Sequence, residues 1–178
     1  MRILLSTLIA SMFLLLSACN KENKGVTFSY TFNAEAVIPS STGINLPINI
    51  LSPDLTTNSG SSFEANQTTP ALVRDIKMKQ LELKIKSPNQ TTFDFLRSIR
   101  IYISADGLAE REIAWATDIP ENGARSLLLT TDLETNYKEY IVKESVSLRV
   151  QATTRQLLTS DTRLEILPRF EVRASLRK

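Results

Sequence analysis

The chain contains 178 residues, and its 21 Lys and Arg residues nearly balance its 19 Asp and Glu residues, giving a formal net charge of +2. Nucleic-acid binding normally requires a strongly basic domain or stripe, so we expect no nucleic-acid partner. The chain has no histidine and one cysteine, Cys19. This composition excludes an internal disulfide and argues against a zinc site or a histidine-based catalytic triad.

The N-terminal segment has the pattern of a targeting sequence. Arg2 supplies a positive charge, and residues 3–16 form an apolar run interrupted only by hydroxyl residues. The sequence becomes polar again at Lys21. The run suits the hydrophobic region of a signal peptide and is short for a bilayer-spanning helix, which needs about 20 residues.

The four residues Leu16-Ser17-Ala18-Cys19 resemble the lipobox of bacterial lipoproteins. The resemblance implies cleavage before Cys19, with Leu16 as the recognised apolar position and Ser17 and Ala18 as the small positions. It also implies a diacylglycerol, together with an N-terminal acyl chain such as palmitate, on Cys19. Two or more acyl chains give durable membrane attachment, and the acylated thiol is then unavailable as a nucleophile or metal ligand. A chance cysteine behind an ordinary signal peptide and an uncleaved anchor are the alternatives.

The residues after the cysteine bear on which membrane holds the anchor. Asn20 is not the aspartate that resembles an inner-membrane retention signal, so we expect the outer membrane, with its periplasmic leaflet favoured. The pair Lys21-Glu22 resembles the charged export signals of surface lipoproteins in the Bacteroidetes, although Asn23 breaks the usual acidic pair. Display on the cell surface is therefore the alternative.

Apolar and polar residues alternate with a period of two along most of the remaining chain, which is typical of half-buried strands. Such strands predict an all-β fold, an antiparallel β-sandwich of roughly seven to nine strands that is immunoglobulin-like in general architecture. The expected organisation is a cleaved signal peptide at 1–18, a short polar tether at 19–25 and one domain at 26–178. The segments with this alternation are 26–38, 44–50, 76–85, 99–103, 112–117, 125–130, 146–152 and 164–176.

Three irregularities interrupt the strand pattern. Pro47 lacks a donor for a sheet ladder, which predicts an edge strand. The alternation slips by one residue at Lys79-Gln80, which predicts a bulge or two short strands. Pro168 predicts that the last strand is divided or lies at an edge.

Two segments depart from the strand pattern: Phe93, Phe95 and Leu96 fit a short turn or helical corner, and a second segment has helical spacing. After Asp132, a suitable N-cap, the residues Tyr137, Tyr140 and Ile141 recur at helical spacing. This spacing predicts a short helix near residues 133–142.

Residues 52–70 are rich in Ser, Thr, Asn and Pro, which predicts a long mobile loop. Loops of this length in a compact domain are usually functional or disordered. The segment is the best single candidate for a contact surface, and a slack connector is the alternative.

The sequence offers few groups for catalysis. No calcium-binding or phosphate-binding loop motif occurs, so we expect neither a metal nor a cofactor. A glycosidase needs only two carboxylates, and the candidates cluster around a predicted hairpin. Alternating Glu and Arg is, however, the ordinary pattern of a solvated strand face. The clustered carboxylates are Glu110, Glu112, Asp118 and Glu121.

Two further groups are candidates for surface contacts. Trp115 and Tyr102 are suited to stacking on sugar rings, although a Trp beside Ile113 and Ala114 is also expected to pack in a core. Four lysines form the most basic group of residues in the chain. One interpretation is that they contact anionic headgroups or polysaccharide. The other is that they protect exposed strand edges from pairing with another chain. These lysines are Lys77, Lys79, Lys84 and Lys86.

The sequence therefore predicts a non-enzymatic, lipid-anchored envelope protein that acts as a binding or assembly module at the outer membrane. Its expected partners are the membrane, through the lipid on Cys19, and an envelope protein or glycan. The alternatives are an accessory subunit of an envelope transport or secretion complex and a carboxylate-based enzyme acting on glycans.

Overall fold

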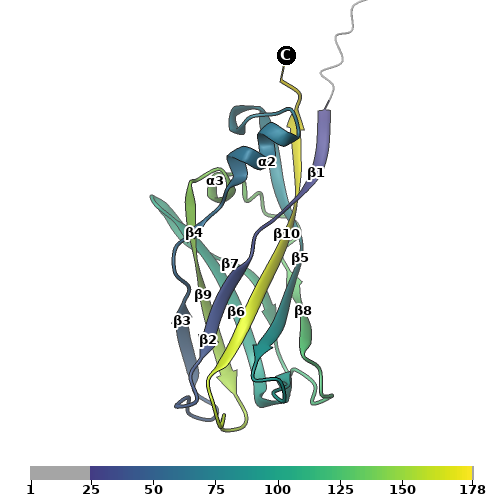
Figure 1. Ribbon diagram of the computed structural model, residues 1–178. Coiled ribbons are helices and arrows are strands. Elements are labelled where there is room, and N and C mark those ends of the chain that lie inside the picture. Colours follow the sequence, from purple (N-terminus) through teal and green to yellow (C-terminus); the bar gives the residue numbers. More distant parts are fainter. Residues whose placement is uncertain (1–24, 178) are drawn as a thin grey trace, which may run out of the picture.

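The computed structural model describes residues 25–177, so Leu16, Ser17, Ala18, Cys19 and the predicted signal peptide lie outside the described residues. The described part is an all-β, antiparallel structure with two short α-helices, which confirms the predicted fold class (Figure 1). The strands are β1 (Gly25–Thr31), β2 (Ala34–Ile38), β3 (Pro47–Leu51), β4 (Leu55–Thr56), β5 (Val73–Ser87), β6 (Leu96–Ala105), β7 (Leu108–Ala116), β8 (Ser126–Thr131), β9 (Ser145–Thr154) and β10 (Thr162–Ser175). The helices are α2 (Ser59–Ala65) and α3 (Lys138–Ile141), and the 3-10 turns are η1 (Pro70–Leu72) and η2 (Phe93–Phe95).

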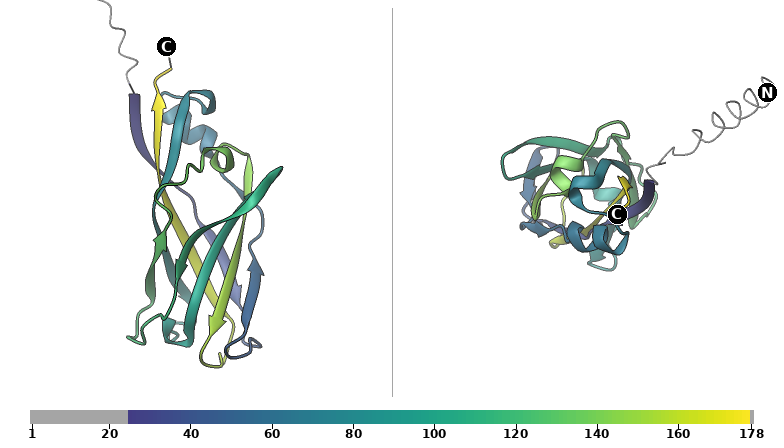
Figure 2. Two further views of the ribbon diagram at one scale, coloured as in Figure 1. Left: turned by 180° about the vertical axis from the view of Figure 1, so that it is seen from behind. Right: turned by 90° about the horizontal axis from the view of Figure 1, so that it is seen from above.

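The strands form two layers that share β8. One layer has the order β1–β10–β5–β8, with β2 also pairing with β10, and the other has the order β7–β6–β9–β3, with β4 also pairing with β9. The first part of β8 pairs with β5, as in Ser126 opposite Lys84. The last two residues, Thr130 and Thr131, pair with β7 instead. The sheet therefore turns from one layer into the other along a single strand. Figure 2 shows the strands from behind and from above.

The core lies between the two layers. Successive side chains of a strand point to opposite faces, so one residue in two is buried along each long strand. In β5, Met78, Leu81 and Leu83 are fully buried, and in β6 Ile99 and Ile101 face them from the other layer. Helix α3 lies within the segment 133–142 and confirms the predicted helix, which contributes the buried side chain of Ile141 among others.

The predicted bulge at Lys79-Gln80 is confirmed. Arg169 of β10 pairs with Gln80, but the next residue, Phe170, pairs with Met78. Lys79 is thus the extra residue, and it restores the inward orientation of the side chains that follow. Strand β5 consequently remains one continuous strand of 15 residues.

The two prolines behave differently. Pro47 begins β3, which pairs only with β9 among the described residues and lies at one end of the sheet, as predicted for an edge strand. The prediction for Pro168 is wrong, because β10 is continuous and lies between β1 and β5. The break in pairing lies in the neighbouring segment, between β1 and β2. Strand β10 pairs with Thr31 and with Ala34 but with neither residue between them. On the side of β1 and β2, Pro168 thus lies beside a break in the pairing, where its missing N–H leaves no acceptor of those strands unpaired.

Trp115 is half-buried and does not belong to the core, contrary to the core packing suggested by its neighbours. Ile101 pairs with Ala114, whereas Tyr102 pairs with Glu112, so Ile113 is an extra residue in β7. The bulge lets Ile113 and Ala114 both be buried and turns Trp115 to the outer face.

The segment 52–70 is not the continuous mobile loop that its composition predicts. It contains β4 and α2, and Phe63 of α2 is fully buried. Its threonines bind neighbouring main chain: Thr57 Oγ1 donates to the carbonyl oxygen of Lys143 at 2.7 Å, and Thr68 Oγ1 donates to that of Ser175 at 2.7 Å. One buried aromatic ring and these hydrogen bonds fold the segment onto the sandwich, despite its polar sequence.

Candidate functional site

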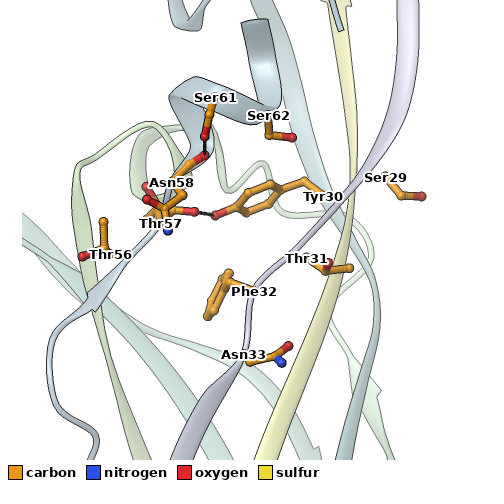
Figure 3. A pocket seen from close by; sticks show the side chains of 10 residues that line it. All are labelled: Ser29, Tyr30, Thr31, Phe32, Asn33, Thr56, Thr57, Asn58, Ser61 and Ser62. Atoms are coloured by element: carbon orange, nitrogen blue, oxygen red, sulfur yellow. Dashed lines mark hydrogen bonds between the residues drawn. The ribbon is translucent and has the colours of Figure 1, made fainter. Parts of the chain in front are cut away.

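A cleft of about 570 Å³ lies between the end of β1 and the start of α2. One wall is the chain from the end of β1 to the start of β2, and the other runs from the end of β4 into α2 (Figure 3). We call this cavity the seam cleft, because it lies where the two ends of the sheet face each other. It is lined by Ser29, Tyr30, Thr31, Phe32, Asn33, Thr56, Thr57, Asn58, Ser61 and Ser62.

The seam cleft opens because the two ends of the sheet diverge. Strands β2 and β3 lie side by side at one end of the molecule (Figure 1). Further along, β1 has only β10 as a hydrogen-bonded strand neighbour among the described residues, and β4 has only β9. No strand of residues 25–177 fills the space between them, so the gap is left as a groove.

The side chain of Tyr30 spans this gap. Tyr30 is 3% exposed, and its hydroxyl donates a hydrogen bond to the main-chain carbonyl of Thr57 on the opposite wall (Figure 3). Burial raises the pKa of Tyr30 to about 12, although the hydrogen bond to Thr57 acts in the opposite direction. The phenol therefore stays protonated, and acts as a donor, throughout the physiological pH range.

Phe32 forms the second aromatic part of the floor. Its ring is stacked on that of Phe170, with centroids 6.1 Å apart and planes at 19°. The centroid of Tyr30 also lies 6.1 Å from that of Phe32. Figure 3 shows the half-buried ring of Phe32 standing in the cleft beneath Tyr30. The floor is thus rigid and apolar, because these rings pack against the core.

The second wall is held by hydrogen bonds around Thr57 and Asn58. The main-chain N–H of Thr57 donates to the carbonyl oxygen of Glu144 at 2.9 Å, and Ser61 Oγ donates to the carbonyl oxygen of Asn58 at 2.9 Å. Asn58 has a left-handed backbone conformation with φ 50°, and its side chain makes no capping hydrogen bond to α2. The Asn58 amide therefore remains at the rim of the seam cleft and is not used to stabilise the helix.

The seam cleft is electrically neutral. None of its ten lining residues is a Lys, Arg, Asp or Glu, and Tyr30 is its only titratable group. The remaining lining residues are hydroxyl and amide side chains, apart from Phe32. This lining has hydrogen-bond donors and acceptors on two facing walls, and its one titratable group does not change charge near neutral pH. The arrangement is suited to binding and offers nothing for general acid–base catalysis.

The four predicted contact lysines all lie on β5, where each forms an ion pair. Strand β5 lies between β10 and β8, but β8 pairs only with residues 81–84, so the interpretation that these lysines protect an edge is wrong for Lys84 alone. Because a carboxylate accompanies every one of them, the lysines do not form an unbalanced basic patch. The pairs are Lys77–Glu134 at 3.3 Å, Lys79–Glu171 at 3.2 Å, Lys84–Glu82 at 3.4 Å and Lys86–Glu165 at 3.4 Å.

Three of the four clustered carboxylates are each paired with a different arginine. The hydrogen bond from Arg149 lowers the pKa of Glu110, which is opposite to the shift that a general acid needs. Asp118 lies in a turn with φ 50°. The geometry therefore does not favour the carboxylate-based enzyme. The ion pairs are Glu110–Arg149 at 2.6 Å, Glu112–Arg100 at 2.7 Å and Glu121–Arg155 at 2.8 Å.

The predicted aromatic contact residues lie outside the seam cleft. The Arg149 guanidinium lies 3.9 Å from the ring centroid of Tyr102, so one face of that ring is covered. Trp115 is on the neighbouring strand, opposite Arg100. Neither residue lines the cleft.

Sequence reasoning missed the residues of the first wall, because 26–38 was predicted as one strand. The break falls at Phe32 and Asn33, between β1 and β2. Asn33 is the only signal in the sequence, since Asn is depleted in strands. Within residues 25–177, no group of three or more His, Cys, Asp or Glu side chains is placed to hold a metal ion. No helix in that part of the chain has the length and apolar character needed to cross a membrane.

No protein family and no curated protein sequence matches this chain significantly. Among solved structures, it is similar to Desmodium yellow mottle tymovirus, with 14% identity, coverage of 92% of this chain and 95% of that chain, and a TM-score of 0.33. It is also similar to the decameric BFDV capsid protein (10% identity, 85% and 99% coverage, TM-score 0.40) and to the 60-mer BFDV capsid protein (9% identity, 88% and 97% coverage, TM-score 0.37). At these TM-scores, the likenesses carry no argument about function.

Proposed function

We propose that this protein is a non-enzymatic, lipid-anchored envelope protein of the bacterial outer membrane that binds a ligand in its seam cleft. The observation that carries the proposal is the sequence Leu16-Ser17-Ala18-Cys19 directly behind a short apolar run. A neutral cleft on a rigid β-sandwich supports the binding role. The arginine pairing of the carboxylates and the absence of histidine support a role without catalysis.

The chain length between the anchor and the domain restricts how the domain lies on the membrane. Even fully extended, the stretch from Cys19 to Gly25 spans at most about 20 Å. The start of β1, the end of β10 and helix α2 all lie at the same end of the sandwich (Figure 1). We infer that this end is the membrane-proximal one. The seam cleft begins at Ser29, about 13 Å further along β1.

The anchor is tested by metabolic labelling of the producing cells with radioactive palmitate, followed by membrane fractionation. The full-length protein should be labelled and should fractionate with the outer membrane, whereas Cys19→Ala should be unlabelled and released from it. Protease treatment of intact cells then assigns the leaflet, because only a surface-displayed domain is digested. An unlabelled wild-type protein would contradict the proposal.

A second candidate function, an accessory subunit of an envelope complex, is favoured by strand β3. This edge strand exposes large apolar side chains, since Leu46 before it is 64% exposed and Leu51 at its end is 72% exposed. Unpaired apolar edges pair readily with another chain. Stoichiometric co-purification with a membrane complex, abolished by Leu51→Lys and retained by Leu128→Lys, would favour this function.

A further inference from the structure

We infer that the seam cleft binds a neutral oligosaccharide. The inference rests on the proposed function and extends it by naming the chemical class of the ligand. Four properties of the cleft carry it: its neutrality, the kind of polar groups on its walls, its aromatic floor and its size.

The lining of the cleft favours ligands that are not recognised through charge. The charged side chains of Glu82, Lys84 and Arg169 belong to a neighbouring cavity that shares residues 31–33 with the cleft. Sites for phosphate, carboxylate or nucleic acid use Lys or Arg for charge-assisted hydrogen bonds. Sites for basic ligands use Asp or Glu. The seam cleft has none of these four residue types among its lining residues. Within the seam cleft, a ligand is therefore recognised by uncharged polar groups.

The polar groups on the walls match the hydroxyls of a sugar. Hydroxyl and amide side chains both donate and accept hydrogen bonds, as sugar hydroxyls do. Asn33 stands on one wall and Asn58 on the other, and serine and threonine residues flank both. A ligand with hydroxyls on two sides can thus bind both walls at once.

The floor suits a pyranose ring better than an extended peptide. The C–H groups of a sugar ring pack well on an aromatic surface, whose face carries partial negative charge. Phe32 offers such a surface and is held in place by its stacking on Phe170. A peptide added as a strand along β1 needs pockets for its alternate side chains. The cleft is a single cavity with Tyr30 and Phe32 as its aromatic lining residues, and it does not form a row of separate pockets.

The size of the cleft fits a short glycan segment. Sites for small ligands generally have volumes of about 300–1,000 Å³. At about 570 Å³, the seam cleft lies within this range. It therefore accommodates a few sugar units of an oligosaccharide or of one strand of a larger polysaccharide.

The test uses the full-length lipidated protein in detergent micelles and isothermal titration calorimetry. One set of probes contains neutral glycans from outside the cell: maltohexaose, laminarihexaose, mannohexaose and xylohexaose. A second set contains neutral polysaccharide purified from the envelope of the producing cell. Hexagalacturonate and an uncharged Ser/Thr-rich decapeptide are the contrasting ligands. Binding in either neutral set supports the inference, and the set that binds identifies the source of the glycan.

Two variants test whether binding takes place in the seam cleft. Asn33→Ala combined with Asn58→Gly removes both amides, and glycine tolerates the left-handed conformation at position 58. Losing two hydrogen bonds should weaken binding by about tenfold or more. Phe32→Leu should also weaken binding while keeping an apolar side chain on the core. The matched control is Asn45→Gly, because Asn45 is also exposed with a positive φ of 59° but lies outside the cleft.

Thermal unfolding of each variant checks that the fold is retained, and palmitate labelling is measured on the same preparations. The inference is overturned if no neutral glycan binds, if hexagalacturonate or the peptide binds more tightly, or if the folded cleft variants bind like the wild-type protein. Failure of glycan binding in a protein that is still palmitate-labelled overturns this inference and leaves the lipid anchor standing. A protein that binds glycan through the cleft but is not palmitate-labelled overturns the lipid anchor and leaves this inference standing.

Discussion

The hydroxyl of Tyr30 donates a hydrogen bond to the main-chain carbonyl of Thr57 and so joins the two ends of the sheet, which no strand pairing connects in the part of the chain that the structure describes. Both residues are buried, at 3% and 4% exposure. The bond therefore connects the two walls of the seam cleft at a buried position.

Tyr30→Phe should destabilise the protein. The substitution removes the hydroxyl but keeps the ring, so the buried carbonyl of Thr57 loses this partner. An unsatisfied buried acceptor costs about 1–3 kcal/mol. The free energy of unfolding measured in urea should fall by that amount. Tyr102→Phe, on the outer face, is the control, and an equal loss in both variants would show that the bond to Thr57 has no special role.

The stability of the protein should decrease at high pH because of Tyr30. Its pKa is raised to about 12 in the folded protein, whereas an unfolded tyrosine titrates near 10. Its contribution to stability is therefore complete below about pH 10 and is lost as the pH rises toward 12, at a rate of at most about 1.4 kcal/mol per pH unit. Urea unfolding between pH 9 and 11.5 should show a steeper loss for wild type than for Tyr30→Phe. Parallel curves for the two proteins would contradict this assignment.

Arg125 should be irreplaceable by lysine. Its guanidinium donates to the carbonyl oxygens of Ile85, Pro88 and Thr91 at 2.8, 2.9 and 2.7 Å, and also to that of Asn89. A lysine ammonium cannot reproduce this planar set of donors. Arg125→Lys should lower the free energy of unfolding by roughly 2–3 kcal/mol, since hydrogen bonds to charged groups contribute about 1.5–3 kcal/mol each.

The matched control for Arg125 is Arg163→Lys. Arg163 forms an exposed ion pair with Glu35 at 3.0 Å, and such pairs contribute at most about 1 kcal/mol. Chemical denaturation of both variants side by side gives the comparison. A similar small effect in the two proteins would mean that the Arg125 hydrogen bonds do not hold the turn after β5.

Phe63→Ala should release the segment 52–70 from the sandwich. Phe63 is fully buried and packs edge-to-face against Phe28, with ring centroids 6.2 Å apart. Replacing a buried Phe by Ala costs about 3–5 kcal/mol. Limited proteolysis should cut this segment first in the variant. Glu64→Ala, on the exposed side of the same helix, should leave the cleavage pattern unchanged.

The features that were predictable from the sequence depend on residues that are close together along the chain. The slip in alternation at Lys79 identified the bulge, and Pro47 identified the edge strand, because both follow from local backbone geometry. The short helix near Tyr137 and Ile141 was also accessible from spacing alone. Predictions of this kind need no knowledge of which strands lie together.

The seam cleft was not predictable in this way, because its two walls come from residues 29–33 and 56–62. Their meeting depends on the register of β1 with β10 and on the burial of Phe63. Likewise, the carboxylate partners of Lys79 and Lys86 come from β10, so the sequence showed the lysines as a patch that the pairing neutralises. Long-range register decides such features, and composition does not reveal it.

The position of the seam cleft along β1 has a mechanical consequence. Gly25, where the tether joins the domain, and Thr31, where the cleft is lined, are the two ends of the same strand. If Cys19 carries the proposed lipid, a pull on a ligand bound there would be transmitted along the covalent backbone of β1 toward the membrane. The second wall belongs to the β4–α2 segment of the other layer, so the hydrogen bond from Tyr30 to Thr57 would link that wall to the same strand.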